Sequence, residues 1–255
     1  MISVILPARN EQWRLPPTLQ EIRFFMERHP DLISEVIIVD DGSTDTTVER
    51  TLALSDKFNG KLRIERLMQN IGKWSAIRHG ISVAKNDVLL LLDADGAASI
   101  TELEAFDVHK FMKRRQCVFG SRFIQGATIN GKSISRNIVS RIYRQYVSFM
   151  YWFASGKRDI DDMQCPFKLI YKSRMVRPLV AERFAGDIDL AYSLKGNIYN
   201  HPVQFAHQAG SKVSFKTSWN MFWETIRVVR FQKRFLNALR NGTLLMQDNK
   251  IYKDT

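Results

Sequence analysis

Two short runs in the first half of the chain are apolar at every position, and aspartates follow each run at once. Val36–Val39 leads into Asp40–Asp41, and Val88–Leu92 leads into Asp93–Asp95. A strand with apolar side chains on both faces is typical of the covered, central strands of a parallel sheet. Ligands bind such sheets in the crevice beyond the carboxyl ends of the strands. The sequence therefore predicts that two acidic pairs converge on one ligand-binding edge.

Around these runs, β-branched or leucine-rich segments alternate with helical patterns. Strands are predicted at Ser3–Leu6, Glu35–Val39, Leu62–Arg66, Asp87–Leu92 and Val118–Gly120. Helices are predicted near residues 17–28, 44–58, 72–84 and 101–115. This alternation predicts an α/β fold with a mainly parallel sheet flanked by helices.

The chain length and the cysteine content limit the class of protein. Its 255 residues suit one α/β domain, and two cysteines, Cys117 and Cys165, indicate a reducing compartment and no disulfide framework. No signal peptide is recognisable at the start, and the most apolar stretch, Tyr146–Ala154, is far shorter than the ~20 residues of a spanning helix. We expect a cytoplasmic protein that does not cross a membrane.

The formal net charge of +12 is concentrated in two segments, residues 132–158 and 205–240. An anionic partner is therefore expected: a phosphorylated substrate, a membrane surface or nucleic acid. A nucleic-acid-binding protein is the distant alternative, because the sequence has no recognition-helix or RNP motif and this reading leaves the strand-end carboxylates unexplained.

Three polar loops follow predicted strands. Asp93 and Asp95 could share a hard divalent cation that bridges to substrate phosphates, although a solvated turn has the same composition. In Asn70–Lys73 a glycine permits close backbone approach and a lysine can meet phosphate. Pro7–Glu11 either belongs to the same site or is an ordinary loop that connects a strand to a helix.

In their order and spacing, these loops resemble those of family 2 glycosyltransferases with the GT-A fold. The ordered set is Pro7–Glu11, Asp40–Ser43, Asn70–Lys73, Asp93–Asp95 and Gly120–Arg122. A second set resembles the subgroup that uses a polyprenyl-phosphate acceptor, which includes the dolichyl-phosphate mannose and glucose synthases: Asp161, Cys165, Phe167–Lys168, Asp187, Asp189 and Gly210–Lys212. Asp95–Ala97 is closer to the glucose branch.

The resemblance covers residues 1–215, predicted to be the GT-A domain. Residues 216–241 are predicted to be an amphipathic helix, within that domain or at a membrane interface, and 242–255 a polar tail.

The resemblance also implies roles for individual residues. Donor-binding positions are Pro7, Arg9, Glu11, Asp40, Asp41, Lys73, Asp93, Ala94 and Asp95. Asp95 and Asp93 would hold Mg²⁺ or Mn²⁺. Basic positions facing the donor and acceptor phosphates are Arg122, Arg136, Lys168 and Lys212. Catalytic positions are Asp93, Asp95, Asp187 and Asp189. The implied reaction is inverting transfer of a hexose from a nucleoside-diphosphate sugar, UDP-glucose before GDP-mannose, to a polyprenyl or dolichyl phosphate.

Several residues depart from the family pattern. Trp74 replaces a small residue, Gly186 replaces an aromatic residue, and Pro166 replaces a glycine. Arg9 stands where tyrosine is frequent, and Ala97 replaces a glutamine of the mannose branch. These departures leave the sugar and the nucleoside open.

A phosphate acceptor would need little help from a base. A phosphate monoester has a second pKa near ~6, so it is already a nucleophile at neutral pH. Transfer to a glycan hydroxyl is the alternative, and Asp187 or Asp189 would then be the general base. A non-catalytic GT-A scaffold is less in keeping with the retained Asp93 and Asp95.

The two basic segments also contain aromatic residues at helical spacing, in 138–153 and 217–240. In the second, Arg227, Arg230 and Arg234 share one helical face. Such helices lie in membrane interfaces, or they pack on the domain with their charges in solvent. We expect peripheral association with the cytosolic face of a membrane, where a polyprenyl phosphate would be found.

Overall fold

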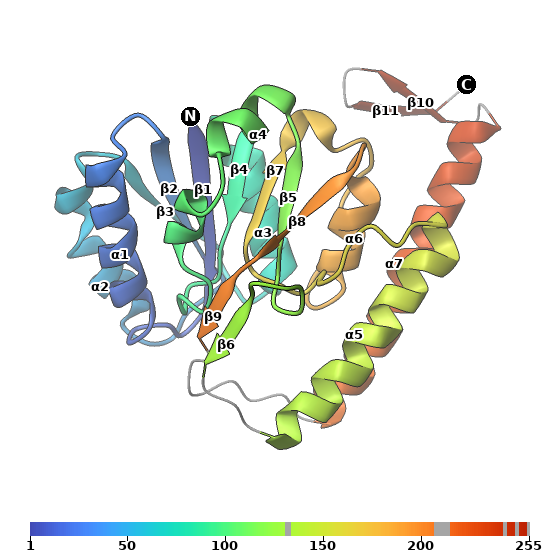
Figure 1. The fold of residues 1–255 in the computed structure, drawn as a ribbon, viewed down its shortest axis with the longest axis horizontal. Helices are drawn as coiled ribbons and strands as arrows, with labels where there is room; N and C mark the ends of the chain where they lie inside the picture. Colours follow the sequence, from blue (N-terminus) through green and yellow to red (C-terminus); the bar gives the residue numbers. More distant parts are fainter. Residues whose placement is uncertain (131–133, 207–214, 242–243, 248–249, 254–255) are drawn as a thin grey trace.

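A seven-stranded sheet forms the centre of the computed structural model, which describes residues 1–130, 134–206, 215–241, 244–247 and 250–253. Within 134–142, 215–218, 239–240, 244–247 and 250–253 it describes the backbone alone. The strands of the sheet are β1 (Ile2–Ala8), β2 (Ile33–Asp40), β3 (Leu62–Arg66), β4 (Val88–Leu91), β5 (Cys117–Ser121), β7 (Lys168–Tyr171) and β8 (Ile198–Pro202). Their order is β3-β2-β1-β4-β7-β5-β8 (Figure 1).

Helices flank this sheet on both faces (Figure 1). They are α1 (Leu15–Arg28), α2 (Thr47–Leu52), α3 (Lys73–Val83), α4 (Val108–Arg114), α5 (Ile134–Ser155), α6 (Gly186–Ser193) and α7 (Phe215–Arg240). Short 3₁₀ turns are η1 (Ser55–Phe58), η2 (Ile100–Glu104) and η3 (Lys172–Arg174). Two small ribbons pair β6 (Thr128–Asn130) with β9 (Gln204–Ala206) and β10 (Leu244–Gln247) with β11 (Lys250–Lys253).

The prediction of a mainly parallel α/β sheet is confirmed. β1 runs parallel to β2 and β4, β2 parallel to β3, and β5 parallel to β8. Only β7 is reversed within this sheet, pairing antiparallel with both β4 and β5. Because β1, β2, β3 and β4 point the same way, the loops that follow them meet at one edge of the sheet.

Side chains of β1 alternate between two apolar cores. Val4 and Leu6 belong to the core that includes Leu19 of α1, whereas Ile5 belongs to the core that includes Ile77 of α3. Both cores are built from fully buried residues, so the carboxyl-end loops rest on a rigid support.

The two long helices α5 and α7 lie side by side along one side of the domain (Figure 1). Val147 and Tyr151 of α5, and Val228 and Val229 of α7, join the core on the α3 face. Tyr146 donates a hydrogen bond to the carbonyl oxygen of Phe222 at 3.2 Å, which ties the two helices together. One face of each helix therefore packs on the domain. No helix among the described residues is both long and apolar enough to span a bilayer.

Two predicted helices differ from the structure. The segment 44–58 forms α2 and then η1, and the chain turns out of η1 at Asn59, whose left-handed backbone ends the helical path. The segment 101–115 divides into η2 and α4, because the Asp107 side chain accepts the backbone N–H of Lys110 and starts a new helix.

Within the segment 242–255, predicted to be a polar tail, β10 and β11 pair as antiparallel strands. Leucine, isoleucine and tyrosine in those strands favour extended backbone.

Candidate active site

The loops at the carboxyl ends of β1, β2, β3 and β4 enclose a cavity of about 460 Å³. Its wall consists of Pro7, Ala8, Arg9, Glu11, Asp41, Asn70, Gly72, Lys73, Asp93, Ala94, Asp95, Arg183 and Phe184. Eight of the nine donor-binding residues predicted from sequence therefore lie together around one hollow. The volume and the polar lining suit a small polar ligand.

Basic side chains pair with both carboxylates that follow β4. Lys73 Nζ lies 2.6 Å from Asp93 Oδ1, and Arg14 Nη1 lies 3.8 Å from Asp95 Oδ2. Arg14 also donates two hydrogen bonds to the carboxylate of Glu11, at 2.7 and 2.5 Å. Lys73 and Arg14 thus each lie beside a carboxylate of the cavity wall.

Burial of this network shifts the pKa of its members. Burial raises the pKa of Asp95, and the Asp93 carboxylate raises it further. Burial likewise raises the pKa of Glu11, against the opposing effect of Arg14. Burial alone would lower the pKa of Lys73, but the carboxylates of Asp93, Asp187 and Asp95 outweigh it and raise that pKa. Burial and neighbouring carboxylates therefore disfavour the ionised forms of Asp95 and Glu11, which a bound cation would stabilise.

Asp93 and Asp95 fit a divalent cation that is completed by a substrate. Within the described part of the chain, no three His, Cys, Asp or Glu side chains are grouped to hold a metal ion. Two carboxylates are nevertheless the usual protein share of a Mg²⁺ site whose other ligands are water and substrate phosphates. Burial together with like charge explains why this pair would accept a hard cation.

The two aspartates at the end of β2 make different contacts. Asp41 lines the cavity and accepts the backbone N–H groups of Ile71, at 2.8 Å, and Gly72, at 3.0 Å. Asp40 is fully buried outside the cavity wall, where its carboxylate accepts the backbone N–H of Ser43 and lies 3.8 Å from Arg66. The structure thus does not place Asp40 in the donor cavity as predicted, because the last strand residue points into the domain.

Asp187 and Lys168 form an ion pair close to this cavity. Lys168 Nζ lies 2.7 Å from Asp187 Oδ1 and also donates to the carbonyl oxygen of Cys165. The side chain of Lys168 is almost fully buried, whereas that of Asp187 keeps some exposure. The Asp187 carboxylate also contributes to the raised pKa of Lys73 in the cavity and of Tyr143 on α5.

Asp189, the other predicted catalytic residue of α6, is fully buried. Its carboxylate accepts the backbone N–H groups of Val180 and Ala181 and the side-chain amide of Gln232. With its oxygens occupied in this way, Asp189 does not face a substrate, contrary to the prediction. It orders the segment that leads to Arg183 and Phe184.

α7 holds the same segment through Glu224. Its carboxylate accepts the backbone N–H groups of Glu182, Arg183 and Phe184 at 2.9, 2.9 and 2.8 Å. Arg183 and Phe184, which complete the cavity wall, are therefore held by a helix far along the chain.

Some of the predicted phosphate-binding residues are already paired with carboxylates. Arg122 donates from Nε and Nη2 to the carboxylate of Asp162, at 2.7 and 3.0 Å, and its guanidinium lies over the ring of Phe205. Asp162 is fully buried, so this pair first of all stabilises the fold. Arg136 lies on α5 where the backbone alone is described, and Lys212 lies outside the described residues.

Sequence reasoning missed three residues of the site: Arg14, Arg183 and Phe184. Arg14 stands three residues after Glu11, and this i, i+3 spacing of opposite charges was the available signal. No spacing signal identifies Arg183 and Phe184, because hydrogen bonds to Glu224 put them there.

The two thiols are expected to be inert in the folded protein. Burial raises the pKa of Cys117 to about 11 and that of Cys165 to about 12, and the thiolate is the reactive form. Iodoacetamide at pH 8 should therefore label neither cysteine until the protein is denatured, as followed by intact-mass spectrometry. Rapid labelling of native Cys165 would contradict this placement.

Comparison with known proteins points to one family. The sequence profile described as Glycosyl transferase family 2 matches residues 3–173. Human dolichyl-phosphate beta-glucosyltransferase is 32% identical over 248 residues, which cover 91% of this chain and 75% of the human protein. The Drosophila melanogaster protein of the same name is 33% identical over 86% of this chain and 71% of its own length.

Among solved structures, glucosyl-3-phosphoglycerate synthase from Mycobacterium tuberculosis, in complex with Mn²⁺ and UDP-glucose, superposes with a TM-score of 0.68. That match covers all of this chain and 86% of the mycobacterial chain, at 16% identity, and so concerns the fold.

Proposed function

This chain belongs to glycosyltransferase family 2, and we propose that it transfers glucose from UDP-glucose to dolichyl phosphate or a related polyprenyl phosphate. As a glycosyltransferase it needs a donor site, and the cavity that gathers Glu11, Asp41, Lys73, Asp93 and Asp95 is the observation that carries the proposal. Glucose and dolichyl phosphate are supported by relatives about one-third identical over most of the chain.

The nucleotide is proposed to bind along the β1 and β2 loops. Asp41, already fixed by the Ile71 and Gly72 amides, and Arg9 and Glu11 offer polar groups for the nucleoside. Lys73 lies beside the carboxylates of Asp93 and Asp95, where the diphosphate would arrive. A divalent cation held by Asp93 and Asp95, Mg²⁺ or Mn²⁺, would supply Lewis-acid stabilisation of the diphosphate leaving group.

The acceptor is proposed to approach from the side of Asp187 and Lys168. A hydroxyl acceptor would need a general base, and the carboxylate proposed for that role, Asp187, is paired through Oδ1 with Lys168 at 2.7 Å. A phosphate acceptor needs no such base, because its dianion is already a nucleophile near neutral pH. Direct attack of a phosphate oxygen on the anomeric carbon would invert its configuration, and UDP would leave.

Transfer from radiolabelled donors tests the proposal. Purified protein in detergent with dolichyl phosphate and Mg²⁺ or Mn²⁺ is given UDP-glucose or GDP-mannose, and label is counted in the organic phase. Label from UDP-glucose alone supports the proposal, and label from GDP-mannose would show that the transferred sugar is mannose. Metal-dependent donor hydrolysis without lipid product would contradict the proposed lipid-phosphate acceptor.

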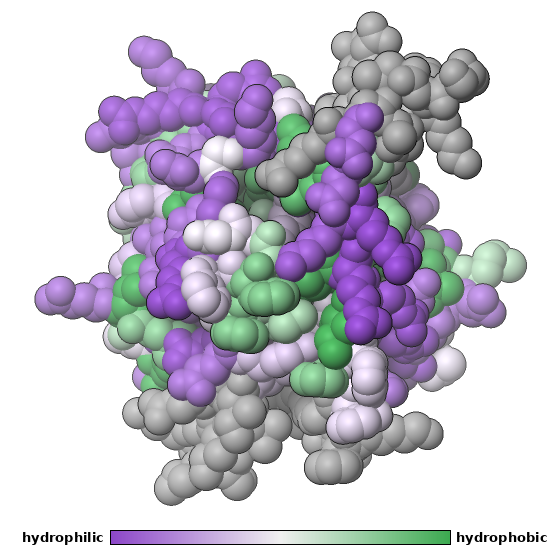
Figure 2. All heavy atoms as spheres, turned by 90° about the vertical axis from the view of Figure 1, so that its right-hand side faces the viewer, coloured by the Kyte–Doolittle hydropathy of each residue, from purple (hydrophilic) through white to green (hydrophobic). Residues whose placement is uncertain are grey.

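We also propose that the α5–α7 surface contacts a membrane. Figure 2 faces the side of the molecule along which α5 and α7 run and shows apolar and weakly polar side chains bordered by hydrophilic ones. Exposed aromatic residues from both helices contribute: Phe149, Trp152, Phe153, Trp219, Trp223 and Phe231. Arg227, Arg230 and Arg234 are exposed beside them. Aromatic rings next to basic residues favour the interface of an anionic bilayer.

Vesicle flotation checks this surface. We expect the protein to float with liposomes containing 30% phosphatidylserine. The triple variant Arg227→Gln/Arg230→Gln/Arg234→Gln should bind about 10²-fold more weakly, at about 1 kcal/mol per charge. The control Lys110→Gln/Lys113→Gln/Arg114→Gln removes three exposed charges from α4 and should float like wild type. Equal loss in both variants would point to net charge and contradict a specific surface.

A further inference from the structure

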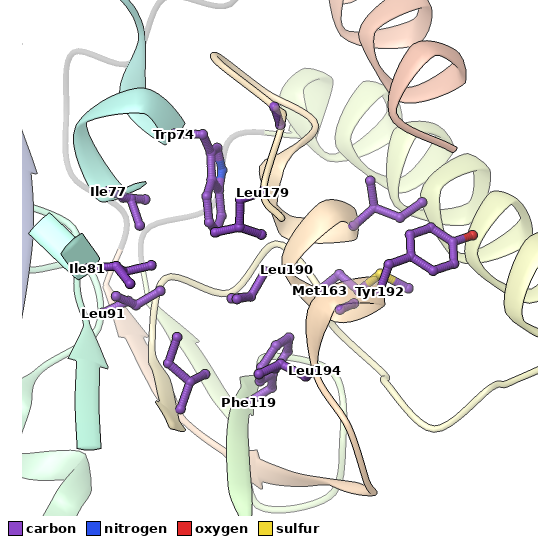
Figure 3. Packing of buried hydrophobic residues seen from close by; sticks show 14 of the residues in the cluster. Trp74, Ile77, Ile81, Leu91, Phe119, Met163, Leu179, Leu190, Tyr192 and Leu194 are labelled. Atoms are coloured by element: carbon purple, nitrogen blue, oxygen red, sulfur yellow. The ribbon is translucent and has the colours of Figure 1, made fainter. Parts of the chain in front are cut away.

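Trp74 lies directly against the backbone of Gly186. The indole is 3% exposed, and a Cβ atom added at residue 186 would lie 1.9 Å from Trp74 Cδ2 and 2.0 Å from Cγ. Carbon atoms in contact are ordinarily ~3.5–4.0 Å apart, so no side chain fits at residue 186 while the indole stays in place. In Figure 3 the indole stands between α3 and the segment that carries Leu179.

Each member of this contact adjoins a charged residue of the site. Lys73 and Trp74 are the first two residues of α3, and Gly186 and Asp187 are the first two residues of α6. The contact therefore sets how closely two helix N-termini approach, one carrying the ammonium of Lys73 and the other the carboxylate of Asp187. The structure thus brings into contact two positions that are far apart in the sequence.

Backbone contacts reinforce the junction. The amides of Trp74 and Ser75 both donate to the carbonyl oxygen of Glu182, at 2.9 and 3.0 Å. At Gly72, whose φ is +106°, an added Cβ would lie 2.4 Å from that same oxygen. The start of α3 is thus fitted against residues 182–186 with no spare space.

We propose that Trp74 is a positioning residue: its indole, seated on Gly186, fixes the distance between Lys73 and Asp187 across the active site. Trp74 itself is too buried to stack on a sugar, so it acts through its neighbours. The inference rests on the proposed function for its kinetic consequence, whereas its packing consequence is independent of any substrate.

A double-mutant cycle tests the contact. Gly186→Ala in the wild-type background should lower the Tm by about 5 °C or more, because the added methyl overfills a packed site. In a Trp74→Ala background the same change should have little effect, since the obstructing indole is gone. Equal effects in the two backgrounds, or a Gly186→Ala variant as stable as wild type, would overturn the proposal. If Trp74→Ala does not fold, Trp74→Ser supplies the second background, because serine also lacks the ring atoms that lie against residue 186.

Nucleotide binding separates positioning from plain stability. Trp74→Ala should weaken calorimetric binding of UDP with Mn²⁺ about 10-fold, and Ile81→Ala, a core truncation on the same helix, should leave it within about 2-fold. If the two variants lose stability alike and bind UDP alike, Trp74 is structural only and the proposal fails.

These measurements also distinguish this inference from the proposed function. Absence of glucose transfer by the wild-type protein would reject the function, yet the Tm cycle and UDP binding would still decide the role of Trp74.

Discussion

Asp95→Ala is expected to lower kcat/KM for glucose transfer by about 10³-fold, the largest loss for any single substitution in the cavity. The carboxylate would hold the divalent cation that stabilises the diphosphate leaving group, and such stabilisation contributes several kcal/mol, or about 10³ in rate. Steady-state rates at saturating dolichyl phosphate measure the effect. Asp31→Ala removes an exposed carboxylate outside the cavity and should leave the rate unchanged.

The same variant is expected to be at least as stable as wild type. Burial and the Asp93 carboxylate raise the pKa of Asp95 in the folded protein. A carboxyl whose pKa is higher in the folded than in the unfolded chain binds its proton more tightly when folded, so its ionisation lowers stability as pH rises. At pH 7.5 alanine removes this unfavourable charge, and the Tm should not fall. Retention of activity within about 10-fold of wild type would remove Asp95 from the proposed mechanism.

Asp162→Ala is expected to have the largest effect on stability, lowering the free energy of unfolding by about 3 kcal/mol. Asp162 is fully buried and accepts two hydrogen bonds from the side chain of Arg122, which alanine would leave as a largely buried, uncompensated charge. Urea unfolding followed by tryptophan fluorescence gives the change.

Glu104→Ala is the matched control, because Glu104 accepts from Arg28 and His29 at the surface. It should cost less than about 1 kcal/mol. The double variant Arg122→Met/Asp162→Leu should recover much of the loss, because apolar residues of similar size can replace a buried pair. Similar losses for Asp162→Ala and Glu104→Ala would contradict the stabilising role given to the buried pair.

The strands that could be predicted from sequence are those whose pattern of apolar residues is visible within the strand itself. Val36–Val39 and Val88–Leu91 are apolar at each position, and they lie in the strands β2 and β4. β7 was not predicted because it is short and begins with Lys168, a lysine whose buried ammonium is paired with Asp187 and the Cys165 carbonyl. A long-range ion pair thus conceals a core strand from sequence inspection.

The residues of the site likewise divide into those that local sequence predicts and those that depend on packing. Motif spacing and strand-end position predicted the residues around the cavity, since parallel strands bring their following loops together. Spacing could not separate Asp41 from Asp40, or Asp187 from Asp189, because neighbouring residues in a strand or a helical turn differ in direction. Which member faces the cavity depends on packing from elsewhere in the chain.

The hydrogen bonds from residues 182–184 to Glu224 affect the order in which the active site assembles during protein synthesis. Lys73, Asp93 and Asp95 can come together once β1 has paired with β4, within the first hundred residues or so. The hydrogen bonds that hold Arg183 and Phe184 to Glu224 can form only after α7 is made, some forty residues later. In a growing chain, the charged residues that follow β1 and β4 would therefore come together first, and Arg183 and Phe184 would complete the cavity wall last. Nucleotide capture by ribosome-bound chains of increasing length should begin abruptly near the emergence of Glu224.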